Sequence, residues 1–315
     1  MRKTFLIAAA VAFTGAAQAA PLTLTGNFLN VGISDFGTFG SNGTNPPGLQ
    51  HDPTGTNNFG VNDYLTPGAP HDAFGLSSTQ FTWEGSSTNS NGNDGNSAFG
   101  SSSPTLLAGA AALGYSNAAT WSGSGLGVNI TNNYFFNNGD ERVRIQSIIT
   151  ATQELNNVLF GRSVDPDPDV NTNNDFDTRN VRGDLLTAPE DLVSSAGQAT
   201  GLTLAILNDP SNPYASNTGI SDDSGVGCCD IDDPANVLVG YGPTFPSFNV
   251  GDYGLQMAWN LGDFAVDQAK TVEYYYVFGA RQDVISEPTP TPEPASLALL
   301  GLGLGALAVA RRRRA

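Results

Sequence analysis

The chain has 315 residues and a formal net charge of −17, because 30 Asp and Glu side chains outnumber 13 Lys and Arg. A surface this acidic repels nucleic-acid phosphates and anionic lipid headgroups and attracts divalent cations and cationic partners, so the charge disfavours a nucleic-acid-binding function. Hydrophobic residues make up 39% of the chain, which is too large a share for a wholly disordered protein.

The first 19 residues have the three parts of a secretory signal peptide. Arg2 and Lys3 form the positive start, residues 5–16 form an apolar run, and Ala17 and Ala19 supply the small side chains of a signal-peptidase site. We therefore expect an exported protein whose mature chain begins at the next residue.

Residues 20–286 contain many short runs that are rich in apolar, β-branched and aromatic side chains and have the length of strands. The runs cover residues 22–29, 79–83, 128–136, 143–152, 155–162, 202–207, 237–241, 255–261 and 271–278. Arg142 and Arg144 alternate with Val143 and Ile145, which is the period of a sheet with one buried face. This pattern predicts an all-β body.

Helical periodicity is confined to two short candidates, residues 105–113 and 188–196. Three stretches, 34–70, 86–103 and 209–234, are expected to be long loops, because they are dense in Gly, Asn, Ser and Pro or in acidic residues. The body is therefore predicted to be an antiparallel β-sandwich, or a barrel, with long Gly- and Asn-rich loops.

The most regular pattern in the body is a segment, 165–177, in which every second residue has an oxygen-bearing side chain. Its members are Asp165, Asp167, Asp169, Asn171, Asn173, Asp175 and Asp177. Alternate residues of an extended chain face one way, so this edge would offer oxygen ligands to Ca²⁺, which takes six to eight of them. Val170 and Phe176 stand where an EF-hand loop needs Gly and Glu. The alternative is a solvated acidic turn after a strand.

Cys228 and Cys229 are adjacent in the sequence. In an oxidising compartment they leave three alternatives: a strained disulfide between neighbours, an intermolecular bridge, or two free thiols. The acidic residues around them form a second candidate cation site or a solvent-exposed loop; they are Asp222, Asp223, Asp230, Asp232 and Asp233. His51 and His71 each precede an Asp, and we expect both at the surface or in turns.

Sequence motifs for catalysis are missing: there is no GxSxG, HExxH or P-loop pattern. Carboxylates are too numerous for any one pair to indicate a glycosidase. Trp83, Trp121, Trp259 and the tyrosines at 274–276 would suit stacking on sugar rings if they were exposed, but we expect core positions. No catalytic residue is therefore predicted.

The body also carries a more general resemblance. Residues 140–174, together with the segments GDYGLQMAWNLGDF and EYYYVFGA, resemble parts of secreted bacterial β-sandwich proteins. The resemblance implies a fold and no particular activity.

The C-terminus carries three segments in order. A Pro-rich linker, 287–294, ends in Pro292, Glu293 and Pro294; residues 295–310 contain no charge; and the basic stop is Arg311, Arg312, Arg313 and Arg314. A helix over the uncharged segment reaches about 24 Å, short of the roughly 30 Å hydrocarbon core of a bilayer. Clustered arginines stay on the cytoplasmic side of a membrane, which leaves the body outside.

This order resembles the PEP-CTERM sorting signal of Gram-negative bacteria. The resemblance implies recognition and removal by a membrane-embedded exosortase, with the helix at 295–315 as a transient inner-membrane anchor. Residues 20–294, which remain without the signal peptide and the segment 295–315, have 7 basic against 30 acidic side chains, a net charge of −23.

The expected protein is an exported, exosortase-processed surface or extracellular-matrix protein, structural or adhesive rather than enzymatic, with calcium as its candidate cofactor. Signal peptidase and exosortase are the expected partners during export, and exopolysaccharide or envelope components afterwards. Two alternatives stay open. An extracellular polysaccharide hydrolase or lyase needs a cleft with convergent carboxylates and exposed aromatics, whereas a carbohydrate-binding module needs exposed coplanar aromatics without such a cleft.

Overall fold

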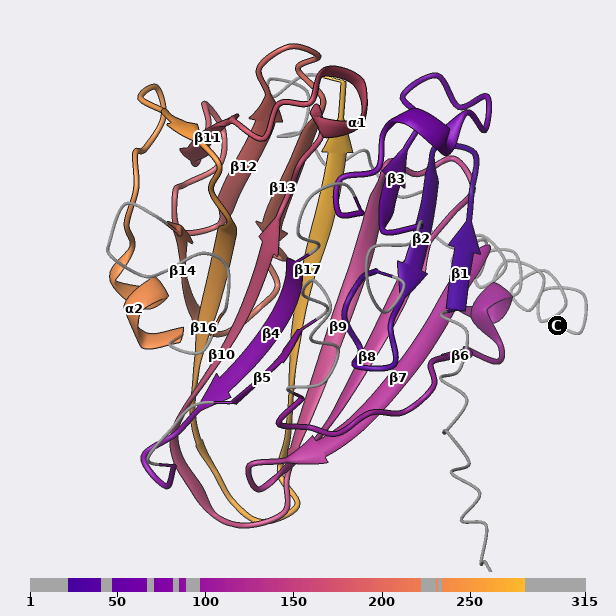
Figure 1. Cartoon of the computed structure of the whole chain (residues 1–315). Coiled ribbons are helices and arrows are strands. Elements are labelled where there is room, and N and C mark those ends of the chain that lie inside the picture. The colour runs from indigo at the N-terminus through magenta and orange to yellow at the C-terminus, as the bar shows by residue number, and fades with distance from the viewer. Residues whose placement is uncertain are drawn as a thin grey trace, which may run out of the picture.

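The computed structural model describes residues 22–40, 47–66, 71–81, 85–88, 97–221, 231 and 234–280. These residues form an antiparallel β-sandwich, as predicted, with two large sheets and a smaller three-stranded one (Figure 1). The bounds 20–286 for the body and those of the terminal segments stay predictions.

The largest sheet has nine strands in the order β15-β11-β12-β13-β17-β9-β8-β7-β6. Their bounds are β6 (Thr105–Leu106), β7 (Asn117–Gly125), β8 (Val128–Phe136), β9 (Arg142–Ala151), β11 (Thr178–Arg182), β12 (Leu192–Gly197), β13 (Thr203–Asn208), β15 (Asn249–Gly251) and β17 (Ala269–Gly279). The C-terminal strand β17 lies between β9 and β13, so it joins the two halves of this sheet.

The second sheet has five strands in the order β14-β16-β10-β4-β5. Its strands are β4 (His71–Ser77), β5 (Gly85–Thr88), β10 (Leu155–Asp165), β14 (Ala215–Ile220) and β16 (Leu255–Phe264). The third sheet consists of β1 (Leu22–Thr25), β2 (Leu29–Ile33) and β3 (Leu49–His51). It lies in front of β7, β8 and β9 in Figure 1. The five-stranded sheet is narrower than the nine-stranded sheet, and the sheet of β1, β2 and β3 covers the part of the core that the five-stranded sheet leaves open.

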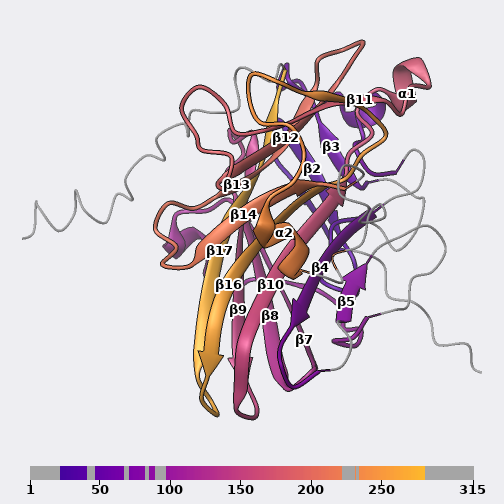
Figure 2. The same cartoon turned by 90° about the vertical axis from the view of Figure 1, so that its left-hand side faces the viewer.

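The helices are short. They are α1 (Val170–Asn173), α2 (Pro234–Val239) and the 3₁₀ turns η1 (Phe59–Val61) and η2 (Ala110–Leu113). Helix α2 packs beside β14 and β16 (Figure 2). Val237 of this helix is buried with Ala73 and Ala258, so α2 covers the outer face of the five-stranded sheet.

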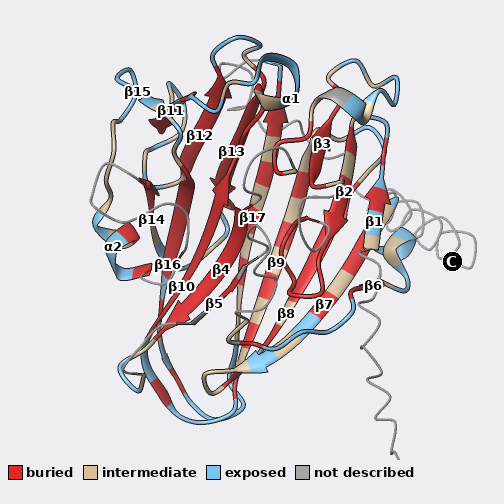
Figure 3. Ribbon diagram, in the orientation of Figure 1, coloured by how far each residue is buried: buried red, intermediate tan, exposed pale blue. Residues whose placement is uncertain are grey.

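Side-chain alternation places the core between the sheets. Along β9, buried side chains alternate with half-buried ones from Arg142 to Ala151, as the sequence pattern predicted. Figure 3 shows buried positions along the strands of both large sheets and exposed positions in the connecting loops. Trp121, Trp259, Tyr274 and Tyr276 are all buried, which confirms the expectation that these aromatic residues belong to the core. Tyr275 is half-buried on the other face of β17, so the expectation is wrong for this residue.

A charged pair lies inside this core. The guanidinium of Arg162 on β10 forms an ion pair with Asp72 on β4, and both side chains are fully buried. Arg162 Nε donates to Tyr276 Oη at 2.9 Å, and Tyr276 donates to Asp72 Oδ1 at 2.6 Å. The amide of Phe39 donates to Asp72 Oδ2 at 2.6 Å. Burial raises the pKa of Asp72 to about 6, against the opposing effect of Arg162.

Most of the predicted strands are confirmed. The runs at 128–136, 143–152, 155–162, 202–207, 255–261 and 271–278 appear as β8, β9, β10, β13, β16 and β17. The run at 22–29 divides into β1 and β2. The run at 79–83 is not a strand in its described part, 79–81.

Several other predictions of secondary structure are wrong. The stretch 209–234, predicted to be a long loop, contains β14, because Ala215–Ile220 pair with β16. The run at 237–241 is not a strand, because its residues up to Val239 belong to α2. The helix predicted at 188–196 is absent, and Leu192–Gly197 form β12 instead, since pairing with β11 and β13 buries all six residues. The helix predicted at 105–113 is limited to the 3₁₀ turn η2 after the short strand β6.

Candidate functional site

A cavity of about 630 Å³ lies on the face of the nine-stranded sheet that is turned away from the core, beside β11 and β12. Strand β12 supplies Leu192, Ser194 and Ala196 to the cavity, and Val193 between them packs into the core. Strand β11 supplies Arg179 and Val181, which pair in register with Ala196 and Ser194. The alternation of two neighbouring strands therefore builds the floor of the cavity.

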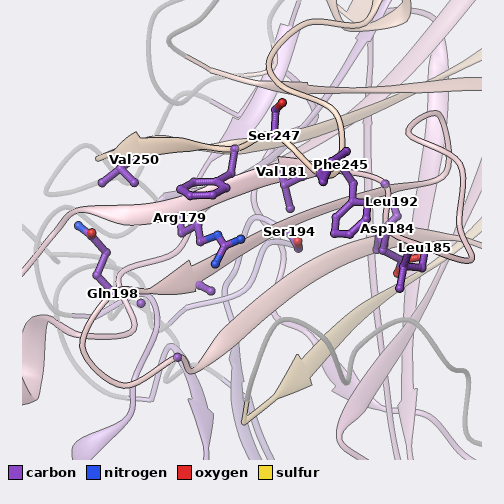
Figure 4. Close-up of a pocket in the computed structure, with 16 residues that line it drawn as sticks. Arg179, Val181, Asp184, Leu185, Leu192, Ser194, Gln198, Phe245, Ser247 and Val250 are labelled. Carbon is purple, nitrogen blue, oxygen red and sulfur yellow. The ribbon is translucent and has the colours of Figure 1, made fainter.

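Two loops form its walls. Figure 4 shows Asp184 and Leu185 at one end of the cavity and Gln198 and Val250 at the other. At the first end, the carboxylate of Asp184 accepts hydrogen bonds from the amides of Leu186 and Thr187, both at 2.7 Å, and so shapes the turn after β11. Asp184 Oδ2 is shielded from solvent.

The segment before β15 forms another wall, and Figure 4 shows its residue Phe245 toward the end of the cavity that carries Asp184. The amide of Phe245 donates to the carbonyl of Arg182 at 2.9 Å, and that of Ser247 to the carbonyl of Thr244 at 2.9 Å. These bonds fix the segment along β11. Phe245 and Phe248 keep 42% and 45% of their surface exposed, and both line the cavity.

Arg179 lies next to one of these rings. Its Cζ atom is 3.8 Å from the centre of the Phe248 ring, a cation–π contact. Among the described residues, Arg179 forms no ion pair and no side-chain hydrogen bond. Among the described residues that line the cavity, Arg179 and Asp184 are the two that carry a charge. The site thus combines apolar walls with the guanidinium of Arg179, whose N–H groups form no hydrogen bond within the described residues.

The residues of this cavity are not among those predicted from the sequence to form a site. The sequence does carry one signal for it, the pair Phe245 and Phe248, two aromatic residues within a loop that has the turn residues Gly242, Pro243 and Pro246. Large apolar residues in such a loop have no strand face to bury them. Their position against β11 depends on long-range pairing, which the local pattern does not reveal.

The predicted calcium array is not a continuous extended edge. Helix α1 interrupts it, and Asn171 and Asn173 within this helix are exposed, while Asp175 follows it and is half-buried. That part of the expectation is wrong, because the chain turns after the buried Asp169 instead of remaining extended.

Asp169 has a different role from the one predicted. Its carboxylate accepts a hydrogen bond from the amide of Ala199 at 2.7 Å and another from the Thr200 hydroxyl. A Cβ atom on Gly197 would lie 2.5 Å from this carboxylate, so the turn between β12 and β13 is built closely around it. Asp169 therefore holds the loop that carries Gln198 at the rim of the cavity.

Asp165 and Asp167 stay together near the end of β10. Burial and the neighbouring Asp252 raise the pKa of Asp165 to about 7. Burial, Asp165 and Asp252 raise that of Asp167 to about 9. Oδ1 of Asp167 is buried and has no hydrogen-bond partner among the described residues. Within the same part of the chain, no group of three His, Cys, Asp or Glu side chains is arranged to hold a metal ion. Calcium binding stays a prediction.

Both histidines are buried, so the expectation that they lie at the surface or in turns is wrong. His51 Nδ1 lies 3.2 Å from the hydroxyl of Tyr64, and its Nε2 lies 3.2 Å from Glu141 Oε1. His71 is on β4, opposite Asp165 of β10. Neither histidine lines the cavity beside β11 and β12.

Several predicted sites lie outside the described residues. They are the cleavage residues Ala17 and Ala19, the cysteines Cys228 and Cys229 with their acidic neighbours, Pro292, Glu293 and Pro294 of the linker, and the arginines Arg311 to Arg314. Trp83 lies outside them too. Within the described part of the chain, no helix is both long and apolar enough to cross a membrane.

Comparison with known proteins identifies the C-terminal segment. Residues 290–314 match the model of the PEP-CTERM protein-sorting motif. A search of curated proteins finds no match to the chain.

The comparison with solved structures finds distant likenesses. A galactose mutarotase related enzyme from Lactobacillus acidophilus is 10% identical with a TM-score of 0.33, and the match covers 85% of this chain and 100% of that one. Heparan sulfate lyase HepC from Pedobacter heparinus is 7% identical with a TM-score of 0.35, over 84% of this chain. The chain spans 37% of that lyase and 23% of a mutant form of it. These likenesses are too distant to identify an activity.

The family match therefore agrees with the order of linker, apolar segment and arginines read from the sequence. The chain ends in a PEP-CTERM sorting motif, which marks it as an exported substrate of exosortase.

Proposed function

We propose that this exported protein is retained at the cell surface or in the extracellular matrix by binding a polysaccharide in the cavity beside β11 and β12, without acting on it as an enzyme. The apolar segment at 295–310 holds the chain in the inner membrane until exosortase removes it near Pro292, Glu293 and Pro294. The folded body then depends on its own binding surface to stay in place.

The gathering of exposed apolar side chains at one cavity carries this proposal. Leu185, Phe245, Phe248 and Val250 are all exposed and all line it, whereas the described large aromatic residues of the strands are mostly in the core. Exposed apolar clusters of this kind mark binding surfaces. The volume of about 630 Å³ lies within the usual range for ligand sites.

The chemistry of the walls supports a sugar as the ligand. The apolar C–H face of a sugar ring packs well on a half-exposed Phe ring such as Phe245 or Phe248. The Arg179 guanidinium and the Gln198 amide lie at the same cavity and can bond to ring substituents.

The distribution of carboxylates supports a role in binding rather than hydrolysis. Glycosidases use two carboxylates that flank the scissile bond. Of the described residues that line the cavity, Asp184 is the one carboxylate, and its Oδ1 already accepts two amide hydrogen bonds. Asp165 and Asp167 belong to a separate, buried place near the end of β10.

The proposal is tested with the mature protein recovered after export and a panel of immobilised polysaccharides. Replacing both Phe245 and Phe248 by Ala is expected to weaken binding about ten-fold or more, because the loss of about 1.4 kcal/mol of contact energy changes Kd ten-fold. Val266→Ala is the matched control, since Val266 is an exposed apolar residue outside the cavity.

Two results would contradict the proposal. One is equal polysaccharide binding by wild type and the double Phe variant. The other is the release of shortened sugar chains by the wild-type protein, which would favour the hydrolase or lyase alternative.

A further inference from the structure

We infer that the sugar bound at this cavity carries a carboxylate, and that Arg179 is the residue that recognises it. The ligand class is thus a glycan that contains uronic acid units. This inference rests on the proposed function, because it specifies the ligand of the same site.

The first observation is the state of Arg179 among the other arginines. Arg144 pairs with Glu273, and Arg162 pairs with Asp72. Arg182 donates to Thr218 at 2.8 Å and to Asn217 at 2.5 Å. Within the described residues Arg179 has neither kind of partner, although acidic side chains greatly outnumber basic ones in this chain. An exposed guanidinium without a carboxylate in such a protein is available to an anion from outside.

The second observation is how Arg179 is held. The contact of its Cζ atom with the Phe248 ring, at 3.8 Å, restrains the guanidinium while leaving its N–H groups unbonded. A guanidinium offers a planar fork of donors that fits both oxygens of a carboxylate, and restraint by stacking reduces the entropy lost when the anion binds.

The third observation is the position of Arg179 relative to the apolar walls. Arg179 lies on the floor of the cavity, between Val250 on β15 and Ala196 on β12, with which it pairs in register. Figure 4 shows Arg179 together with Phe245, Val250 and Gln198 around the same space. A ring seated on the apolar wall would therefore place a carboxyl substituent within reach of the guanidinium.

The two charged side chains of the described lining, Arg179 and Asp184, do not form an ion pair with each other. Asp184, the other charged residue of the lining, lies at the end of the cavity occupied by Leu185, and its Oδ1 is bonded to backbone amides. Repulsion from more distant acids is screened beyond a Debye length of about 8 Å at physiological ionic strength. Direct contact with Arg179 is expected to decide recognition.

The test uses a matched pair of oligosaccharides, one containing uronic acid units and the other its carboxyl-reduced, neutral form. Binding of the mature exported protein is measured by calorimetry at physiological ionic strength. We expect wild type to bind the acidic form about ten-fold or more tightly than the neutral form, since a hydrogen bond between two charged groups is stronger than one to a neutral group. Arg179→Gln should remove this preference, and Arg179→Lys should retain part of it, because Lys keeps the charge without the fork.

The outcomes separate this inference from the proposed function. Equal binding of both oligosaccharides by wild type would overturn the role of Arg179, and so would an unchanged preference for the acidic form in Arg179→Gln. If the variant with Ala at Phe245 and Phe248 still lost binding in that case, the polysaccharide proposal would stand. Tighter binding of a sulfated analogue than of the uronate would overturn the carboxylate assignment. Absence of binding to every glycan, by wild type as well, would overturn both.

Discussion

The buried residues Arg162 and Asp72 show how the two large sheets and the N-terminal region are joined. Asp72 receives hydrogen bonds from Tyr276 of the nine-stranded sheet and from the amide of Phe39, in addition to its ion pair with Arg162. One carboxylate thus links three parts of the molecule. A buried pair contributes little compared with apolar side chains of the same shape, but the loss of one partner leaves an uncompensated charge in the core.

Asp72→Ala is therefore expected to lower the free energy of unfolding by about 3–5 kcal/mol. Urea unfolding of the mature protein measures the change. Glu154→Ala is the control, because Glu154 is exposed and its loss should change stability by less than about 0.5 kcal/mol. A change of similar size in both variants would show that the core pair has no special role.

Asp165 and Asp167 give the protein a predictable response to pH. Their pKa values in the folded protein, about 7 and about 9, lie above the ordinary Asp value. The folded state therefore holds these protons more tightly than the unfolded chain does. Their contribution to stability is complete below about pH 4, the ordinary pKa of Asp, and is lost as the pH rises through the folded values.

With a chelator present, the free energy of unfolding should fall as the pH rises from about 5 to about 9. Asp167→Asn should flatten this decline and should be more stable than wild type at the upper end. Glu154→Gln serves as the control, since Glu154 is exposed and is not among the causes of the pKa shifts of Asp165 and Asp167. Parallel pH profiles for wild type and Asp167→Asn would contradict the assignment.

The same two variants test the calcium prediction. If calcium binds beside Asp165 and Asp167, adding it at about pH 8 should raise the Tm of wild type and of Glu154→Gln and have less effect on Asp167→Asn, because a bound cation offsets the repulsion between the carboxylates. An identical Tm with calcium and with chelator would remove calcium from the description of this protein.

At the scale of elements, strand periodicity was sufficient to predict six central strands, since runs such as 128–136 and 271–278 combine the right length with alternation. Short segments without clear alternation are ambiguous: the run at 237–241, predicted to be a strand, belongs partly to α2, and the segment 188–196, predicted to be a helix, overlaps β12. In both cases packing against distant strands decided the structure. The cavity could not be predicted, because it depends on the register of β11 with β12 and β15.

Gly183, at the start of the loop after β11, tests the rigidity of the cavity wall. Its φ is +68°, and a Cβ atom would lie 2.9 Å from the backbone nitrogen of Pro189. Gly183→Ala is expected to cost about 1–2 kcal/mol of stability and to weaken polysaccharide binding, because the loop that carries Asp184 and Leu185 must move. Gly139→Ala, where no atom lies within 4 Å of the added Cβ, should change neither. Unchanged binding by Gly183→Ala would show that this wall does not contribute to the site.

At the scale of the whole molecule, the sorting motif serves export and processing, and the cavity is proposed to serve binding. The motif at 290–314 directs export and processing. The cavity lies on the outer face of the nine-stranded sheet, where a long polymer can reach it without any change in the core. If the cavity binds polysaccharide as proposed, removal of the apolar tail and capture by polysaccharide are separable steps, and a variant of the cavity alone should uncouple them.

Fractionation of producing cells tests the account most directly. Wild type and the variant with Ala at Phe245 and Phe248 are compared by mass and by location in the cells, the matrix and the medium. We expect both to lose the arginines at 311–314, wild type to be found in the matrix, and the variant to be released into the medium. A processed variant that remains in the matrix as fully as wild type, or a wild-type matrix protein that still carries the arginines, would contradict the account.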